Sequence, residues 1–112
     1  MPKGDLLGAF EQHVLLALIR LGDNAYGMTI RRQIEEKTKR SVSLGAVYAT
    51  LDRLESKKLI TSREGPDMPE RAGRARRYFR IERSGMLALD DALHAIDTLR
   101  DGLPARLAPD QC

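Results

Sequence analysis

A run of arginines offers the most distinctive chemistry in this sequence of 112 residues. Five arginines and no acidic residue occur between positions 71 and 80, namely Arg71, Arg74, Arg76, Arg77 and Arg80. A guanidinium group keeps its charge and binds phosphate oxygens in a bidentate geometry. The run therefore predicts contact with a phosphate backbone. The alternative is a solvated hairpin whose charges block aggregation at the strand edge, and Arg77 in particular could serve only that purpose.

A segment shortly before this run predicts a helix with a second basic surface. Between residues 43 and 57, apolar residues recur at a 3,4,3 spacing, which is typical of a buried helical stripe, and Ser43 suits the N-cap position. On the opposite side we expect residues that are small near the N-terminus and basic near the C-terminus: Ala46, Ala49, Thr50, Arg53 and Lys57. Tyr48 lies at the border of the two faces. Small residues let a backbone approach closely and basic ones read guanine or bind phosphate, so this pattern favours the major groove of DNA.

Periodicity and turn residues predict the elements that position these two surfaces. We expect helices at about residues 7–21, 25–38, 43–57 and 84–100, with Ser84 as the last N-cap, and strands at 60–64 and 76–81. The link 65–75 contains two prolines and two glycines, which suits an exposed hairpin tip. The fold class is therefore mainly α with a small β-hairpin. We expect a winged helix-turn-helix domain over 1–83, and a C-terminal dimerisation helix and tail over 84–112.

Composition argues against several other classes of protein. The net charge is only +3, and a single cysteine, Cys112, with two separated histidines offers no cluster of metal ligands. No nucleophile elbow or phosphate-cradling glycine loop is present, so we expect neither an enzyme nor a cofactor. The longest apolar run, residues 14–19, is too short for a membrane span and lacks the flanks of a signal peptide, so we expect a cytoplasmic protein.

The sequence also resembles the PadR family of bacterial transcriptional regulators over roughly residues 7–100. The resemblance rests on Tyr26-Gly27, on Ser43-Leu-Gly-Ala-Val-Tyr-Ala-Thr-Leu-Asp-Arg-Leu-Glu55, on Gly73-Arg-Ala-Arg-Arg-Tyr-Phe79 and on Ser84-Gly85. It implies a winged-helix fold, a homodimer built through the first and last helices, and usually repression of nearby genes. It also implies that Ser43, Tyr48 and Arg53 lie on or beside the DNA face, with Arg74, Arg76 and Arg77 in the wing. The single C-terminal helix resembles the short subgroup of the family.

Two helices carry more apolar surface than one small domain needs. The first helix is apolar on more than one face, and the last has a 3,4,3 seam, so we expect a dimer interface formed by Phe10, Val14, Leu18, Leu89, Leu93 and Ile96. A small-molecule effector could sit among these residues, although dimer packing explains the set equally well and no feature names a ligand.

These observations favour a homodimeric regulator, most simply a repressor, that binds duplex DNA. Residues 43–57 would form the recognition helix and residues 65–76 the wing, with half-sites about one helical turn apart. The alternative is a winged-helix module that docks an acidic protein partner; duplex binding with strong salt dependence would separate the two. An RNA-binding role fits less well, because the major groove of A-form RNA is too deep and narrow for a helix.

Overall fold

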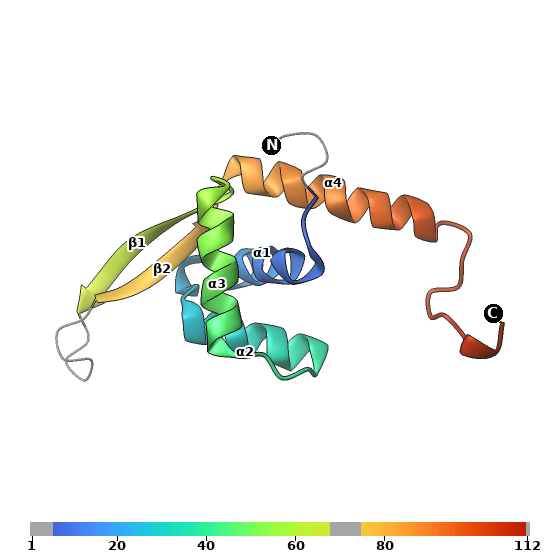
Figure 1. The fold of residues 1–112 in the computed structure, drawn as a ribbon, viewed down its shortest axis with the longest axis horizontal. Coiled ribbons are helices and arrows are strands. Elements are labelled where there is room, and N and C mark those ends of the chain that lie inside the picture. The colour runs from blue at the N-terminus through green and yellow to red at the C-terminus, as the bar shows by residue number, and fades with distance from the viewer. Residues whose placement is uncertain (1–5, 68–74, 112) are drawn as a thin grey trace.

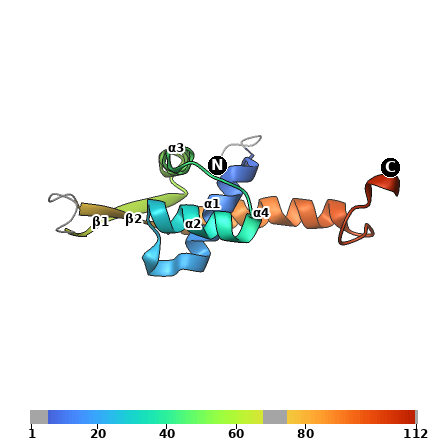
Figure 2. The same ribbon diagram turned by 90° about the horizontal axis from the view of Figure 1, so that it is seen from below.

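A computed structural model describes residues 6–67 and 75–111 of the chain. Its elements, in chain order, are α1 (Ala9–Leu21), η1 (Gly22–Asn24), α2 (Gly27–Thr38), α3 (Leu44–Ser56), β1 (Ile60–Asp67), β2 (Ala75–Ile81), α4 (Arg83–Arg100) and η3 (Pro109–Gln111). Three helices form the body, and the antiparallel hairpin and α4 extend from it in opposite directions (Figures 1 and 2). The expected fold class, mainly α with one hairpin, is confirmed. The expected Arg71 and Arg74 lie outside the described residues.

The apolar stripes of the three body helices meet in one core. Leu15 of α1, Ile30 of α2, and Leu51 and Leu54 of α3 have no exposed surface, and Ile60 at the start of β1 is almost fully buried beside them. The amphipathic spacing of α2 and α3 therefore gives each helix one inward face, as the sequence predicts. Burial of these side chains holds α3 against α1 and α2 and leaves its other face in solvent.

The hairpin of β1 and β2, which is called the wing from here on, is anchored to the body at its base and along one edge. β1 and β2 pair from Ile60 with Ile81 to Glu64 with Arg77, and a further bridge joins Tyr26 to Tyr78. Beside that bridge, Phe79 donates its N–H to the carbonyl oxygen of Ala25 at 2.8 Å. The segment before α2 thus acts as a short third strand, which fixes the hairpin relative to the helix-turn-helix.

The first turn of α4 packs closely against the end of the α3–β1 connection. A Cβ atom at Gly85 would overlap the carbonyl oxygen of Leu59, so only glycine allows this approach. The expectation that Ser84 caps α4 is wrong: α4 begins at Arg83, Glu82 occupies the N-cap position, and Ser84 instead donates its hydroxyl to the carbonyl of Lys58 at 2.6 Å. Ser84 therefore joins α4 to the body. The distal half of α4 extends away from it (Figure 1).

Candidate nucleic-acid interface

The N-terminus of α3 is built by two side-chain hydrogen bonds. Ser43 accepts the N–H of Ala46 at 3.0 Å, which confirms it as the N-cap residue. One residue earlier, the N–H of Val42 donates to the carboxylate of Glu35 on α2 at 2.8 Å. The second bond ties the turn to α2, so the sequence fixes both where α3 starts and the direction from which the chain enters it.

The outward face of α3 carries mostly small side chains along its centre. Its exposed residues are Gly45, Ala46, Tyr48, Ala49, Asp52, Arg53 and Ser56. Gly45, Ala49, Asp52 and Ser56 form the central row, since spacings of four, three and four residues return to one side of a helix. Small residues along this row would let another backbone or a groove wall approach the helix closely.

Thr50 does not belong to this outward face, and its expected position there is wrong. The residue is 2% exposed, because it lies three residues after Val47 and four before Leu54, on the flank of the buried stripe. Its hydroxyl accepts a hydrogen bond from Nη2 of Arg53 at 3.1 Å. Thr50 therefore orients Arg53, which is exposed at the edge of the outward face.

Lys57 is engaged inside the molecule. Its ammonium group lies 2.9 Å from the Glu11 carboxylate, whose other oxygen accepts the N–H of Gly8 at 2.8 Å. Burial alone would raise the pKa of Glu11, but the bond from Gly8, the bond and charge of Lys57 and the charge of Arg53 together lower it below 4.5. The pair ties the C-terminal end of α3 to the start of α1, so Lys57 is part of the scaffold that holds the recognition helix.

Tyr48 leans from α3 onto the N-terminus of α2. A Cβ atom at Gly27 would overlap the Tyr48 hydroxyl, so the glycine provides the space that the phenol ring occupies. The ring remains 39% exposed, and its hydroxyl therefore faces both solvent and the first turn of α2. This arrangement agrees with the expectation that Tyr48 lies at the border of the two faces.

Aromatic rings hold two arginines at one side of the wing. The Arg76 guanidinium lies 4.0 Å from the centre of the Tyr26 ring, and that of Arg63 lies 4.9 Å from the centre of the Tyr78 ring. The two tyrosine rings meet edge to face at 5.4 Å. Cation–π contacts of this kind restrict a long side chain without removing its charge. The stack therefore keeps positive charge fixed beside the Tyr26–Tyr78 pair, along one edge of the wing.

Arg77 points the other way, toward α3. Its Nη2 atom donates to Glu55 at 2.8 Å and to the Ser62 hydroxyl at 3.0 Å, and Ser62 in turn donates to the other carboxylate oxygen of Glu55 at 2.7 Å. The three residues come from the wing strands and the recognition helix. Arg77 therefore mainly links the wing to the recognition helix α3.

Half of the expected dimer interface lies in the core of the single chain. Val14 has no exposed surface, and Leu18 and Leu89 are each 3% exposed. No partner could contact them without rearrangement of the monomer, so their assignment to an interface is corrected. Phe10 and Leu93 are partly buried, and Ile96 on the distal part of α4 is 43% exposed.

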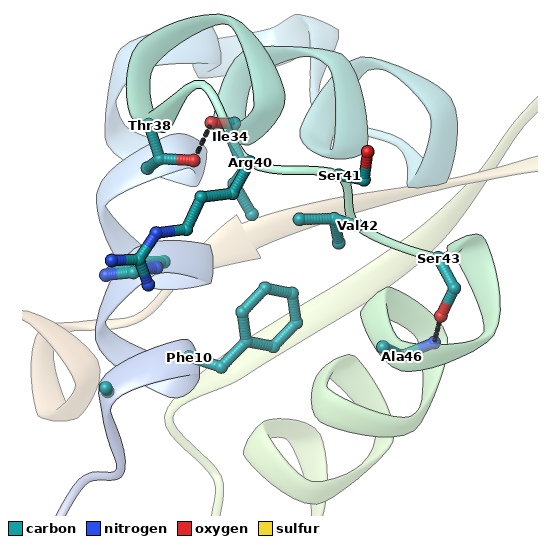
Figure 3. Close-up of a pocket in the computed structure, with 10 residues that line it drawn as sticks. Phe10, Ile34, Thr38, Arg40, Ser41, Val42, Ser43 and Ala46 are labelled. Atoms are coloured by element: carbon teal, nitrogen blue, oxygen red, sulfur yellow. Dashed lines mark hydrogen bonds between the residues drawn. The ribbon is translucent and has the colours of Figure 1, made fainter.

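A pocket of about 350 Å³ lies directly behind the N-terminus of α3. Phe10 from α1 and Arg40 and Val42 from the α2–α3 connection extend into it, and Ser43 and Ala46 form its far side (Figure 3). A second groove, of about 320 Å³, continues along α1 and α2, and both are lined by His13, Ile34 and Thr38. The expected effector set does not form one cavity, because Val14 and Leu89 are in the core and only Phe10 lines this pocket.

Two residues of the candidate interface were missed by the sequence reasoning. Asp52 lies on the central row of α3, whereas the outward side predicted from the sequence does not include it. Arg63 was overlooked because it lies outside the arginine run; its place opposite Tyr78 in the hairpin register was the signal that could have identified it.

Over residues 6–67 and 75–111, no three His, Cys, Asp or Glu side chains gather in a group able to hold a metal ion. No helix in those ranges combines the length and the apolar character needed to cross a bilayer.

Solved structures with the same architecture are numerous. RosR from H. salinarum is 25% identical, with a TM-score of 0.70, and the match covers 92% of this chain and 84% of that one. A transcriptional regulator from Clostridium thermocellum is 25% identical, with a TM-score of 0.68 and coverage of 80% and 84%. A PadR-like transcription factor from Bacteroides fragilis, 21% identical with a TM-score of 0.70 over 82% and 84% of the chains, shares the fold. No curated protein is matched.

The family model for the PadR-like transcriptional regulators matches residues 15–91, which include α2, α3 and both strands of the wing. The match confirms the resemblance seen in the sequence and the winged helix-turn-helix architecture. Because members of this family are transcriptional regulators, it also supports the expectation that the chain is not an enzyme. The chain belongs to the PadR-like family of transcriptional regulators.

Proposed function

We propose that this protein is a homodimeric repressor that binds duplex DNA in a sequence-specific manner. Residues 43–57 would act as the recognition helix in the major groove, and residues 65–76 as the wing on the flanking backbone. The observation that carries the proposal is the outward face of α3, where Gly45, Ala46 and Ala49 leave room for the groove while Tyr48 and Arg53 supply polar contacts.

The scaffold around α3 supports this role. A helix that reads bases must be held rigidly relative to the elements that contact phosphates, because the phosphate contacts set its register. Here Glu11–Lys57 fixes one end of α3 to α1, and Glu55–Arg77 fixes its flank to the wing. Family membership adds independent support, because it rests on sequence similarity and not on this geometry.

The homodimer is supported by apolar surface that one chain leaves uncovered. Leu16 and Ile19 on α1 are 37% and 43% exposed, and Ile96 and Leu99 on the distal half of α4 are 43% and 79% exposed. The groove along α1 and α2 runs beside Leu16 and Ile19. We propose that the distal half of each α4 packs on α1 of the partner and brings two recognition helices to one near-palindromic site.

A charge placed in this interface tests the dimer. Ile96→Glu should shift the protein toward a monomer in sedimentation at micromolar concentration, because a carboxylate buried among apolar side chains is unfavourable. Thr98→Glu adds the same charge on the opposite side of α4 and should leave the dimer intact. A monomeric wild type, or a dimer unaffected by Ile96→Glu, would contradict the proposed interface.

In this proposal, the dimer represses transcription by occupying its site on the DNA. A dimer that covers two adjacent half-sites excludes other proteins from the same DNA, which is the usual outcome in the family it belongs to. Such a regulator would act in the cytoplasm, on the DNA that it binds.

Selection of bound duplexes from a random pool by the purified protein, at about 150 mM salt, tests the function. We expect a near-palindromic motif with half-sites about ten base pairs apart. Recovery of no motif, with binding to an acidic protein surface instead, would favour the alternative docking module.

A further inference from the structure

Asp52 occupies an unusual place for an acidic residue on a surface proposed to bind DNA. It is exposed on the central row of the outward face of α3, between Ala49 one turn before and Ser56 one turn after. Gly45 and Ala49 carry no polar side-chain atoms, so Asp52 has the longest polar side chain on this row. The Asp52 carboxylate therefore lies near the centre of any surface that the outward face of α3 contacts.

The carboxylate has no side-chain or backbone partner in the part of the chain that the structure describes. Across the described residues, 6–67 and 75–111, the Asp52 side chain takes part in no hydrogen bond or ion pair, whereas the side chains of Arg53 and Glu55 do. Arg53 donates to Thr50, and Glu55 accepts from Arg77 and Ser62. No contact among the described residues therefore accounts for this acid.

The position of Asp52 along the helix matches the positions that reach base edges. Helices that lie in the major groove contact bases through residues spaced i, i+3, i+4 and i+7, as in homeodomains. Gly45, Tyr48, Ala49 and Asp52 have this spacing and are all exposed. At the i+7 position, a carboxylate would point to the groove floor and away from the two phosphate backbones that would repel it.

The major-groove code then identifies the base. A carboxylate only accepts hydrogen bonds, so it needs a donor that has no competing acceptor on the same base. Cytosine offers the N4 amino group alone, whereas adenine presents its N7 acceptor beside the N6 amino group. We propose that Asp52 selects cytosine at one position of each half-site, an inference that rests on the proposed DNA-binding function.

Two substitutions of Asp52 give opposite predictions at that one position. Asp52→Asn keeps the shape of the side chain but adds a donor, and asparagine pairs with adenine through N6 and N7, so the preferred base should change from cytosine to adenine. Asp52→Ala should remove the preference there, with about tenfold less discrimination against other bases. Both variants should bind non-specific duplexes more tightly than wild type, because a negative charge near DNA is lost.

The experiment repeats the duplex selection with wild type, Asp52→Asn, Asp52→Ala and Asp91→Asn. The last variant makes the same charge change at an exposed residue of α4, and should reproduce the wild-type motif. A change of base confined to one position per half-site supports the inference, and thermal melting of each variant checks the fold. Motifs from both Asp52 variants that are identical to the wild-type motif would overturn it while leaving the proposed function intact. A wild type that selects no motif would overturn the proposed function as well.

Discussion

The Nη2 atom of Arg77 in the wing lies 2.8 Å from the Oε1 atom of Glu55 in α3, and this ion pair joins the two elements proposed to contact DNA. Ser62 bridges the same two side chains from β1. An arginine that appeared, from its sequence context, to be one more phosphate ligand is instead held by the recognition helix. The wing and α3 are therefore oriented as one unit.

A double-mutant cycle measures this link. Glu55→Ala and Arg77→Ala should each lower DNA affinity a few-fold, and the double variant should be little worse than Arg77→Ala alone, because both remove one orienting contact. In the free energy of unfolding the coupling should be small, about 0.5 kcal/mol, since both side chains are partly exposed. Arg80→Ala removes a wing arginine that is not paired with Glu55 and should show no coupling with Glu55→Ala. Strictly additive effects of Glu55→Ala and Arg77→Ala on DNA affinity would contradict this link between α3 and the wing.

Gly27→Ala should weaken DNA binding and leave the thermal stability nearly unchanged. The added methyl group displaces the Tyr48 ring, which can turn outward because it is already partly exposed, and alanine is compatible with the first residue of α2. We expect a melting temperature close to that of wild type and at least several-fold weaker binding of the selected duplex. Tyr48→Phe keeps the ring and removes only the hydroxyl, so it reports the contribution of that group. Wild-type affinity in Gly27→Ala would show that the position of Tyr48 is unimportant.

The Glu11–Lys57 pair predicts a pH dependence of stability. The pKa of Glu11 is lowered in the folded chain, so folding favours the charged carboxylate. Its contribution is present above pH 4.5, the ordinary pKa, and is lost as pH falls through the lowered folded-state value. Glu11→Gln should therefore lose about 1–2 kcal/mol at neutral pH and show a weaker loss of stability on acidification than wild type. Glu36→Gln, which removes an exposed carboxylate of α2, is the control. Parallel denaturation curves for wild type and Glu11→Gln across this range would exclude the contribution.

Arg53→Ala tests the charged edge of the outward face. We expect binding weakened several-fold or more, and a slope of log affinity against log salt that is smaller by about one if Arg53 contacts a phosphate. A larger change in base preference than in salt slope would instead place Arg53 on guanine. Arg106→Ala removes an exposed arginine of the C-terminal tail and serves as the control for net charge. Unchanged affinity at physiological salt would remove Arg53 from the interface.

Sequence periodicity predicted the elements well, because α2, α3 and α4 each carry a regular apolar stripe and turn residues separate the elements. The beginning of α3 could be predicted from Ser43 alone, since a hydroxyl before an apolar run is a strong cap. Thr50 was misplaced because a polar residue beside a stripe can be buried as easily as exposed, and its spacing to Val47 and Leu54 was the stronger signal. The ion pairs of Arg77 and Lys57 could not be predicted, because their partners Glu55 and Glu11 are distant in sequence.

The sequence also could not show which apolar helix faces are buried within one chain. Val14 and Leu18 are covered by their own chain, whereas Leu16 and Ile19, from the same apolar run, are exposed. Periodicity cannot tell a face buried in the monomer from one that a partner would bury, since both consist of the same residue types. Only the arrangement of the other elements around α1, namely α2, α3, β2 and α4, distinguishes them.

The central claim is that α3 enters the major groove, and methylation interference on the selected duplex tests it most directly. The N7 atom of guanine lies in the major groove, so a methyl group there blocks a helix that approaches it. We expect loss of binding when guanines in either half-site are methylated at N7, in two clusters about ten base pairs apart. Full binding to N7-methylated duplexes, with interference only from adenine N3 in the minor groove, would contradict the account.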